Sequence, residues 1–150
     1  MTDLLRLGPE RSSLLAQLHA EAFPPEEAWN EAAFEGLLSR ASTRAFGMER
    51  DAGLAAFLLV QFVHPEAEIL TLATAPDFQR LGLAQTLVRN TESELRQQGL
   101  EKWLLDVAAD NLPAIAFYRK IGFEEDGRRA GYYNRLEGSR IDAILMSKRV

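Results

Sequence analysis

Hydrophobic and polar residues follow each other in this chain with two periods, one typical of helices and one typical of strands. The longest helical pattern covers residues 82–98, where one side of the expected helix carries Leu83, Leu87, Val88, Thr91 and Leu95. Gly99 follows directly, and glycine is favoured just beyond a helix C-terminus. We therefore expect an amphipathic helix that ends at this glycine.

The first part of the chain predicts a short strand and then two helices. The strand covers residues 4–7 and runs into Gly8-Pro9, where proline suits a first helical turn. Helical spacing then relates Leu14, Leu15, Leu18 and Ala22. Phe23-Pro24-Pro25 interrupts this helix, and Asn30 is suited to cap a second one. The apolar face of that second helix is formed by Phe34, Leu37 and Leu38.

Strand patterns fill most of the remaining chain. We expect strands at residues 43–49, 53–63, 68–74, 101–108, 123–131 and 141–147. Turns are expected at residues 51–53 and at His64-Pro65, and Asn111 is suited to cap a helix that Gly122 ends. Three hairpin-connected strands followed by alternating helices imply an α/β (α+β) fold with a mixed sheet that helices cover on both faces. A doubly wound dinucleotide fold is excluded because the early strands lack crossover helices.

The length and composition suit a single domain that covers residues 1–150. The chain has 150 residues without repeats or a linker, which is enough to bury a core. It contains no cysteine, which excludes disulfides, thiolate metal sites and a cysteine nucleophile and fits a reducing cytoplasm. Residues 1–6 lack the pattern of a signal peptide, and the longest apolar run, residues 54–60, is too short to cross a bilayer. We therefore expect a cytoplasmic protein with no membrane partner.

The charge of the chain is mildly acidic. Its formal net charge is −5, from 17 basic and 22 acidic side chains, which argues against nucleic acid as the main partner because phosphate binding needs a basic surface. An acidic surface favours a cationic substrate such as an amine or a basic peptide. The two histidines, His19 and His64, belong to no histidine–carboxylate cluster in the sequence, so we expect no catalytic metal.

A loop at residues 76–84 joins an expected strand directly to the long helix. The free backbone N–H groups and the positive dipole end of a helix start suit a phosphate or pyrophosphate. Gly82 and Ala84 would let a ligand approach the backbone closely, and Arg80 would add a positive charge. The loop lacks the Gly-Lys-Ser/Thr of a Walker A loop and the third glycine of a dinucleotide fingerprint. A glycine here also fits a simple turn, so the loop alone leaves both interpretations open.

Two motifs in the chain resemble those of a known superfamily. The run Gln79-Arg80-Leu81-Gly82-Leu83-Ala84 is similar to the signature Q/R-x-x-G-x-G/A of the GNAT superfamily of acyl-CoA N-acyltransferases, with Ala84 in the last small position. Residues 111–123 are similar to its run N-x-x-A-x-x-x-Y-x-x-x-G-F. The resemblance implies a GNAT-like central sheet, mixed but mostly antiparallel, with helices on both faces. It also implies acetyl-CoA as the co-substrate.

A narrower resemblance rests on residues 72–80, Ala22-Phe23-Pro24, residues 128–133 and Asp142-Ala143-Ile144. These segments are similar to the RimI-type ribosomal-protein alanine N-acetyltransferases. The resemblance implies transfer of an acetyl group from acetyl-CoA to the N-terminal α-amine of a protein, with a ribosomal protein as the implied partner. Two alternatives remain open. One is acetylation of a small amine, such as an antibiotic or a polyamine, and the other is a non-catalytic module that binds acyl-CoA.

The resemblance implies cofactor contacts in two segments and at one asparagine. Backbone groups of Leu72, Ala73 and Thr74 would pair with the pantetheine arm, and one N–H there would polarise the thioester carbonyl. Backbone N–H groups would bind the pyrophosphate at Arg80, Leu81, Gly82, Leu83, Ala84 and Gln85. Asn111 matches a further cofactor-contacting position, and it is equally suited as a helix N-cap.

Three residues are candidates for acid–base catalysis. Tyr118 could protonate the thiolate leaving group, because a phenol has an ordinary pKa of ~10, and the alternative is a buried aromatic residue. Strand alternation places Asp106 on the face of Leu104 and Ala108, where a carboxylate needs a partner or solvent. The resembled enzymes have a glutamate base at this position, and the shorter aspartate favours a bridging water. Glu68 on the neighbouring strand is the rival base, and a structural carboxylate is the alternative role for Asp106.

Four aromatic residues are candidates for the acceptor side of the site. Phe23, Trp29, Tyr132 and Tyr133 could line a groove for a peptide N-terminus, since aromatic anchors suit peptide binding. The same residues could instead form a satellite of the core.

Overall fold

The structure is a computed structural model that describes residues 4–51 and 53–150. Ala52, in the turn expected at residues 51–53, lies outside the described residues. Residues 1–3, on which part of the signal-peptide expectation rests, lie outside them as well. In the part of the chain that is described, no helix is long and apolar enough to cross a membrane.

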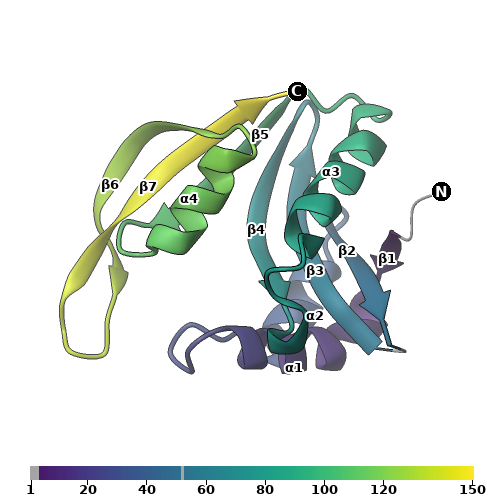
Figure 1. Cartoon of the computed structure of the whole chain (residues 1–150), viewed down its shortest axis with the longest axis horizontal. Helices are drawn as coiled ribbons and strands as arrows, with labels where there is room; N and C mark the ends of the chain where they lie inside the picture. The colour runs from purple at the N-terminus through teal and green to yellow at the C-terminus, as the bar shows by residue number, and fades with distance from the viewer. Residues whose placement is uncertain (1–3, 52) are drawn as a thin grey trace.

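Seven strands in the described residues form one sheet, in the order β1-β2-β3-β4-β5-β7-β6 (Figure 1). They are β1 (Leu5–Leu7), β2 (Thr43–Arg50), β3 (Gly53–Val63), β4 (Glu66–Thr74), β5 (Lys102–Ala108), β6 (Glu124–Asn134) and β7 (Arg140–Arg149). Neighbouring strands are antiparallel except β4 and β5, which are parallel. The mixed, mostly antiparallel sheet expected from the sequence is therefore confirmed.

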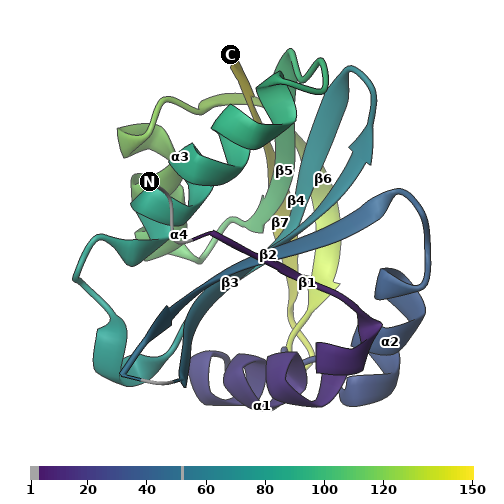
Figure 2. The same cartoon turned by 90° about the vertical axis from the view of Figure 1, so that its right-hand side faces the viewer.

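Helices cover both faces of the sheet, as expected (Figure 2). One layer contains α1 (Ser12–Ala22) and α2 (Glu31–Leu38), and the other contains α3 (Leu83–Arg96) and α4 (Leu112–Lys120). Short 3-10 turns at Pro9–Arg11 and Pro76–Phe78 lie before α1 and α3. Because β3 lies between the two layers, its residues 54–60 are all buried and show no polar alternation.

The helix boundaries follow the capping residues that the sequence places there. The side-chain oxygen of Asn30 accepts the Ala33 N–H at 2.9 Å. The side-chain oxygen of Asn111 accepts the Ala114 N–H at 3.3 Å. Both expected N-caps are therefore confirmed. Beyond the end of α3, Gly99 has a φ of 97°, a conformation that glycine adopts readily.

The last hairpin extends further than the sequence pattern predicts. The strand expected at residues 123–131 is β6, which continues to Asn134, and β7 continues to Arg149. β6 is an edge strand of the sheet, and most of its side chains are exposed. It therefore lacks the apolar alternation that would mark its end in the sequence.

β4 and β5 pair along only part of their length. The parallel pairing joins residues 66–69 to residues 102–105. At the same point Leu70 is the extra residue of a β-bulge in the pairing of β4 with β3. A bulge bends its strand and increases the local twist. Beyond it β4 and β5 diverge, so the middle of the sheet is open between residues 70–74 and residues 106–108 (Figure 1).

Candidate active site

A cavity of about 200 Å³ lies in the opening between β4 and β5. Residues 69–72 of β4 and residues 105–108 of β5 form its sides. Tyr118 lines it from the layer of α3 and α4, and Phe23 lines it from the layer of α1 and α2. Groups from both faces of the sheet therefore meet in this cavity.

A second cavity, of about 280 Å³, lies in front of α3, at the loop expected to bind a pyrophosphate. Its lining includes Arg80, Gly82, Leu83, Ala84 and Gln85. Thr74 at the end of β4 also lines it, and the Gln79 amide donates a hydrogen bond of 3.1 Å to the Thr74 carbonyl. Lys120 at the end of α4 lines the cavity too, and it adds a positive charge that sequence reasoning missed. The two cavities lie along the same strand, β4.

The start of α3 has the features of an anion-binding site. Gly82 has a φ of 79°, and a Cβ built on it would meet no atom within 4 Å. Its carbonyl accepts the Thr86 N–H at 3.1 Å, which is the first hydrogen bond of the helix. The backbone N–H groups before Thr86 therefore have no carbonyl partner within the helix, and they belong to residues that line the cavity. These donors and the positive dipole end suit a pyrophosphate. The residues present therefore fit the acetyl-CoA that the sequence resemblance implies.

The remaining predicted cofactor residues occupy different environments. Leu72 and Asn111 line the cavity between the strands. Ala73 is 2% exposed and belongs to the core beneath α1 and α2. Leu81 is 66% exposed, and its side chain lines neither cavity. The contacts predicted for Ala73 and Leu81 are made by their backbone groups. The environments of their side chains do not test these contacts, which stay predictions.

Tyr118 lies on the buried side of α4 and is 8% exposed. Its ring makes edge contacts with Phe117 and Phe123, with centroids 5.1 and 5.4 Å apart. Burial raises the pKa of Tyr118 well above the ordinary value of a phenol. The hydroxyl is therefore neutral across the physiological range and can act as a donor, although it is a weaker acid than the sequence alone suggests.

Asp106 occupies the face of β5 that strand alternation predicts. The core residues of β5 face the layer of α3 and α4: Trp103, Leu105 and Val107. The Asp106 side chain is 22% exposed and lines the cavity, and its Oδ2 atom lies 3.8 Å from Nη1 of Arg129. Pairing with a cation offsets part of the cost of a carboxylate in an apolar strand.

Glu68 belongs to the same electrostatic group as Asp106. It is half-buried on β4, opposite Leu104 in the parallel register. Burial raises the pKa of Glu68, the charge of Asp106 raises it further, and Arg129 lowers it. The structure thus brings the two predicted bases close enough to interact, but of the two only Asp106 lines the cavity. Within residues 4–51 and 53–150, no group of three or more histidine, cysteine and acidic side chains could hold a metal ion.

Sequence reasoning missed the ion pairs beside the cavity, next to Phe23 and Glu27. Arg135, just after β6, donates to Asp110 at 2.6 and 3.2 Å and lies 3.8 Å from Glu27. These contacts join the β6–β7 turn, the segment before α4 and the α1–α2 connection around a further cavity of about 430 Å³. Arg135 and Asp110 are 25 residues apart in the chain, so neither the charge pattern nor the motifs indicate their contact.

The four aromatic candidates separate into two groups. Phe23 and Tyr133 line the cavity between the strands. Burial, with the charge of Asp106 as a smaller cause, raises the pKa of Tyr133 to about 12. Tyr132 is 49% exposed and packs edge-on against Tyr133. Trp29 packs against the core beneath α1 and α2, so it belongs to the core rather than to the cavity.

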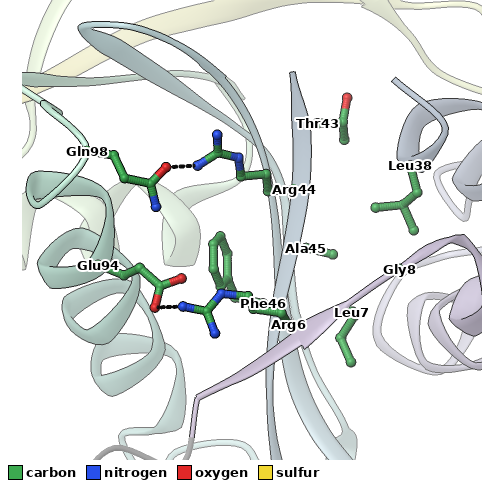
Figure 3. A pocket seen from close by; sticks show the side chains of 10 residues that line it. All are labelled: Arg6, Leu7, Gly8, Leu38, Thr43, Arg44, Ala45, Phe46, Glu94 and Gln98. Atoms are coloured by element: carbon green, nitrogen blue, oxygen red, sulfur yellow. Dashed lines mark hydrogen bonds and ion pairs between the residues drawn. The ribbon is translucent and has the colours of Figure 1, made fainter. Parts of the chain in front are cut away.

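A cavity of about 350 Å³ between β1, β2 and α3 holds none of the predicted site residues (Figure 3). Arg6 pairs with Glu94 across it, and the Arg44 guanidinium donates to the Gln98 side chain. These contacts attach α3 to the edge of the sheet. The cavity lies against α3 and the first strands, away from the opening between β4 and β5, and we assign it a structural role.

The opened sheet and the helix start beside it belong to a chain that is similar to known acetyltransferases. Residues 12–123 match the acetyltransferase (GNAT) family, and the chain belongs to this family. It is 35% identical over 142 residues to ribosomal protein bS18-alanine N-acetyltransferase of Escherichia coli strain K12, covering 92% of each chain. The Salmonella typhimurium enzyme of the same name is 37% identical over 128 residues, which are 85% of this chain and 82% of that enzyme.

A solved structure supports the same relationship. The crystal structure of the ribosomal-protein-S18-alanine N-acetyltransferase from Escherichia coli superimposes with a TM-score of 0.88 and 30% sequence identity. The match covers 98% of this chain and 92% of that one. The GNAT-like fold expected from the two motifs is therefore confirmed.

Proposed function

We propose that this enzyme acetylates the N-terminal α-amine of a protein, with a ribosomal protein that begins with alanine as its substrate in the cytoplasm. The observation that carries the proposal is the 35% identity over 92% of the chain to an enzyme named for an alanine of ribosomal protein bS18. The site supports it, because Phe23, Glu27 and Tyr133 border the acceptor side of the cavity and leave space for an extended peptide end.

We propose that acetyl-CoA lies along β4 and reaches the start of α3. Bound there, it supplies an acetyl group activated as a thioester. The first-turn N–H groups of α3, with Arg80 and Lys120 nearby, would hold the pyrophosphate. Backbone groups of Leu72, Ala73 and Thr74 would pair with the pantetheine arm. They lie past the bulge at Leu70, where β4 no longer pairs with β5.

The acceptor amine must lose a proton to attack the thioester carbonyl. A peptide α-amine has a pKa of ~8 and a lysine side chain a pKa of ~10.4, so the α-amine is far easier to use near neutral pH. Asp106 lines the cavity and could accept this proton through a water, and Glu68 is the alternative acceptor. The attack forms the new N–C bond, and the C–S bond then breaks.

We propose that Tyr118 assists the leaving sulfur. It lines the cavity from the α4 side, opposite Phe23 and Glu27 on the acceptor side. Because its phenol is neutral, it can donate a hydrogen bond to the sulfur as negative charge develops and then transfer the proton. The products are the acetylated amine and the free thiol.

The proposal is tested by incubating the enzyme with acetyl-CoA and a set of acceptors. The set contains a peptide that begins with alanine, the same peptide with a blocked N-terminus and an internal lysine, and a polyamine. Mass spectrometry of the products then locates the acetyl group. We expect acetylation of the free alanine α-amine to be the fastest reaction. Faster acetylation of the polyamine or of the blocked peptide would replace the proposed substrate, and binding of acetyl-CoA without any turnover would indicate a binding module.

A further inference from the structure

His19 is a buried residue in the last turn of α1 that makes contacts in two directions. It is 1% exposed. Its Nε2 atom lies 3.0 Å from the hydroxyl of Thr71 on β4. Its Nδ1 atom accepts the backbone N–H of Trp29 at 3.1 Å. Both ring nitrogens are therefore engaged, and they join the helical layer to the central sheet.

The contacts of His19 determine which nitrogen carries the proton. A backbone N–H can only donate, so Nδ1 must offer its lone pair to Trp29. The ring hydrogen is then on Nε2 and is donated to the Thr71 hydroxyl. Burial also lowers the pKa of His19 to about 4, so the neutral ring is the form present near neutral pH. A proton on Nδ1 would oppose the Trp29 N–H and break this arrangement.

The same imidazole ring packs against both ends of the α1–α2 connection. It stacks on Phe23, with centroids 4.2 Å apart, and on Trp29, with centroids 5.2 Å apart. Phe23 follows α1 directly, and Trp29 precedes the cap of α2. The segment between them carries Glu27, and both Phe23 and Glu27 line the cavity between the strands. Phe23 and Glu27 form one wall of the cavity, and the position of this wall therefore depends on His19.

The other partner of His19 lies at the bulge of β4. Thr71 follows the bulge residue Leu70 and lines the same cavity. The next residue, Leu72, begins the segment proposed to pair with the acyl donor. His19 thus connects the wall on the acceptor side to the strand on the donor side through two hydrogen bonds.

We infer that His19 is a positioning residue for the acceptor: it sets the separation between the α1–α2 connection and β4, and with it the path by which the amine reaches the thioester. This inference rests on the proposed function. It assigns His19 no contact with substrate, because Phe23, Glu27 and Thr71 form the cavity surface. Loss of the two hydrogen bonds should therefore weaken use of the acceptor while binding of acetyl-CoA at α3 is retained.

The experiment uses three variants of the full chain. Thr71→Val removes only the hydroxyl. His19→Phe removes both hydrogen bonds and keeps an aromatic ring, and His19→Asn keeps an acceptor where Nδ1 meets Trp29. The matched control is Thr91→Val, because Thr91 is a fully buried threonine of α3 whose hydroxyl has no hydrogen-bond partner among the described residues.

We expect Thr71→Val and His19→Phe to raise KM for the alanine peptide about five- to tenfold, as the loss of one or two buried hydrogen bonds predicts. The dissociation constant of acetyl-CoA, measured by calorimetry, should change less than about twofold. A change of this size is the smallest expected from the loss of one hydrogen bond. His19→Asn should recover part of the KM of the wild type. Thr91→Val should leave both quantities unchanged.

The possible outcomes separate this inference from the proposed function. A wild-type enzyme that acetylates no α-amine overturns the proposed function, and the inference with it. An active wild type together with an unchanged peptide KM in Thr71→Val overturns the inference alone. An equal loss of acetyl-CoA binding in the His19 variants also overturns it, because the effect would then be a general loss of structure. If His19→Phe does not fold, Thr71→Val still decides the result.

Discussion

Asp106 on β5 and Arg129 on β6 form an ion pair across the intervening strand β7, with Oδ2 and Nη1 3.8 Å apart. The two charges act in opposite directions on a third group, because Asp106 raises the pKa of Glu68 and Arg129 lowers it. Asp106, which lines the cavity, is therefore paired with a cation, whereas Glu68 beside it on β4 is partly desolvated. Substitution of either one changes the environment of its neighbour.

This coupling predicts different pH–rate profiles for the two candidate bases. If Glu68 is the base, Asp106→Asn removes a charge that raises the pKa of Glu68, so the acid limb of kcat/KM should move to lower pH. If Asp106 is the base, the same substitution should lower the rate, mainly at lower pH, where deprotonation of the amine is limiting. Steady-state rates between pH 5.5 and 9 on the alanine peptide would measure this, at roughly half-unit steps.

Glu68→Gln provides the reciprocal test for the same pair. A profile that changes only in this variant assigns the base to Glu68 and leaves Asp106 a structural role. Arg129→Gln is the control for the charge effect, because loss of the cation should raise the pKa of Glu68 and move the acid limb the other way. If the pH–rate profiles of Asp106→Asn, Glu68→Gln and Arg129→Gln all match that of the wild type, neither carboxylate takes the proton.

Tyr118→Phe should lower kcat by ~100-fold or more, because general acid catalysis typically contributes this much. The ring and its packing against Phe117 and Phe123 are kept, so the fold and the affinity for acetyl-CoA should change little. Single-turnover rates and calorimetric titration with acetyl-CoA measure the two effects separately. A variant that keeps nearly full activity would show that Tyr118 is a core residue only.

Gly82→Asp should weaken acetyl-CoA binding by about tenfold or more, since it places a carboxylate where charge-assisted hydrogen bonds to the pyrophosphate are expected. Gly138→Asp is the matched control. Gly138 also has a positive φ, of 94°, and open space around its Cβ position. Each substitution should cost about 1 kcal/mol of stability from the left-handed backbone, but only the first should change affinity. Equal affinities in the two folded variants would contradict the assignment of the loop.

The stability of the protein should depend on pH through His19. The folded pKa is about 4, below the ordinary value of 6.5, so the unfolded state takes up the proton first as the pH falls. The stabilisation is therefore complete above pH 6.5 and is lost progressively towards pH 4. The free energy of unfolding, measured with urea at each pH, should change less between pH 6.5 and pH 4 for His19→Asn than for the wild type.

The parts of the fold that the sequence predicts well are those with a strong period or a cap. β3 agrees with its expected bounds because it is buried on both faces, and Asn30 and Asn111 mark two helix starts directly. The bulge at Leu70 is not visible in the sequence, since Leu70 is apolar like Ile69 and Leu72 and fits an ordinary buried strand. The separation of β4 from β5 is therefore a property of the assembled sheet.

The candidate site shows the same division. The residues in the two motifs could be found because each motif is local, and the structure places Gly82 and Tyr118 at cavities. The ion pair of Arg135 with Asp110 and the contact of Arg129 with Asp106 join distant parts of the chain. Contacts of this kind leave no regular spacing in the sequence. The charge pairs around the cavity could therefore be identified only from the structure.

The opening in the middle of the sheet also has a kinetic consequence. The cavity between β4 and β5 is bordered from both faces of the sheet, so in the proposed reaction the acyl donor and the acceptor would reach the same point by separate routes. Both substrates would then be bound at once, and the acetyl group would pass directly from sulfur to nitrogen. The reaction proposed for this enzyme needs no acetylated enzyme species, so initial velocities at varied concentrations of both substrates should give intersecting rather than parallel reciprocal plots.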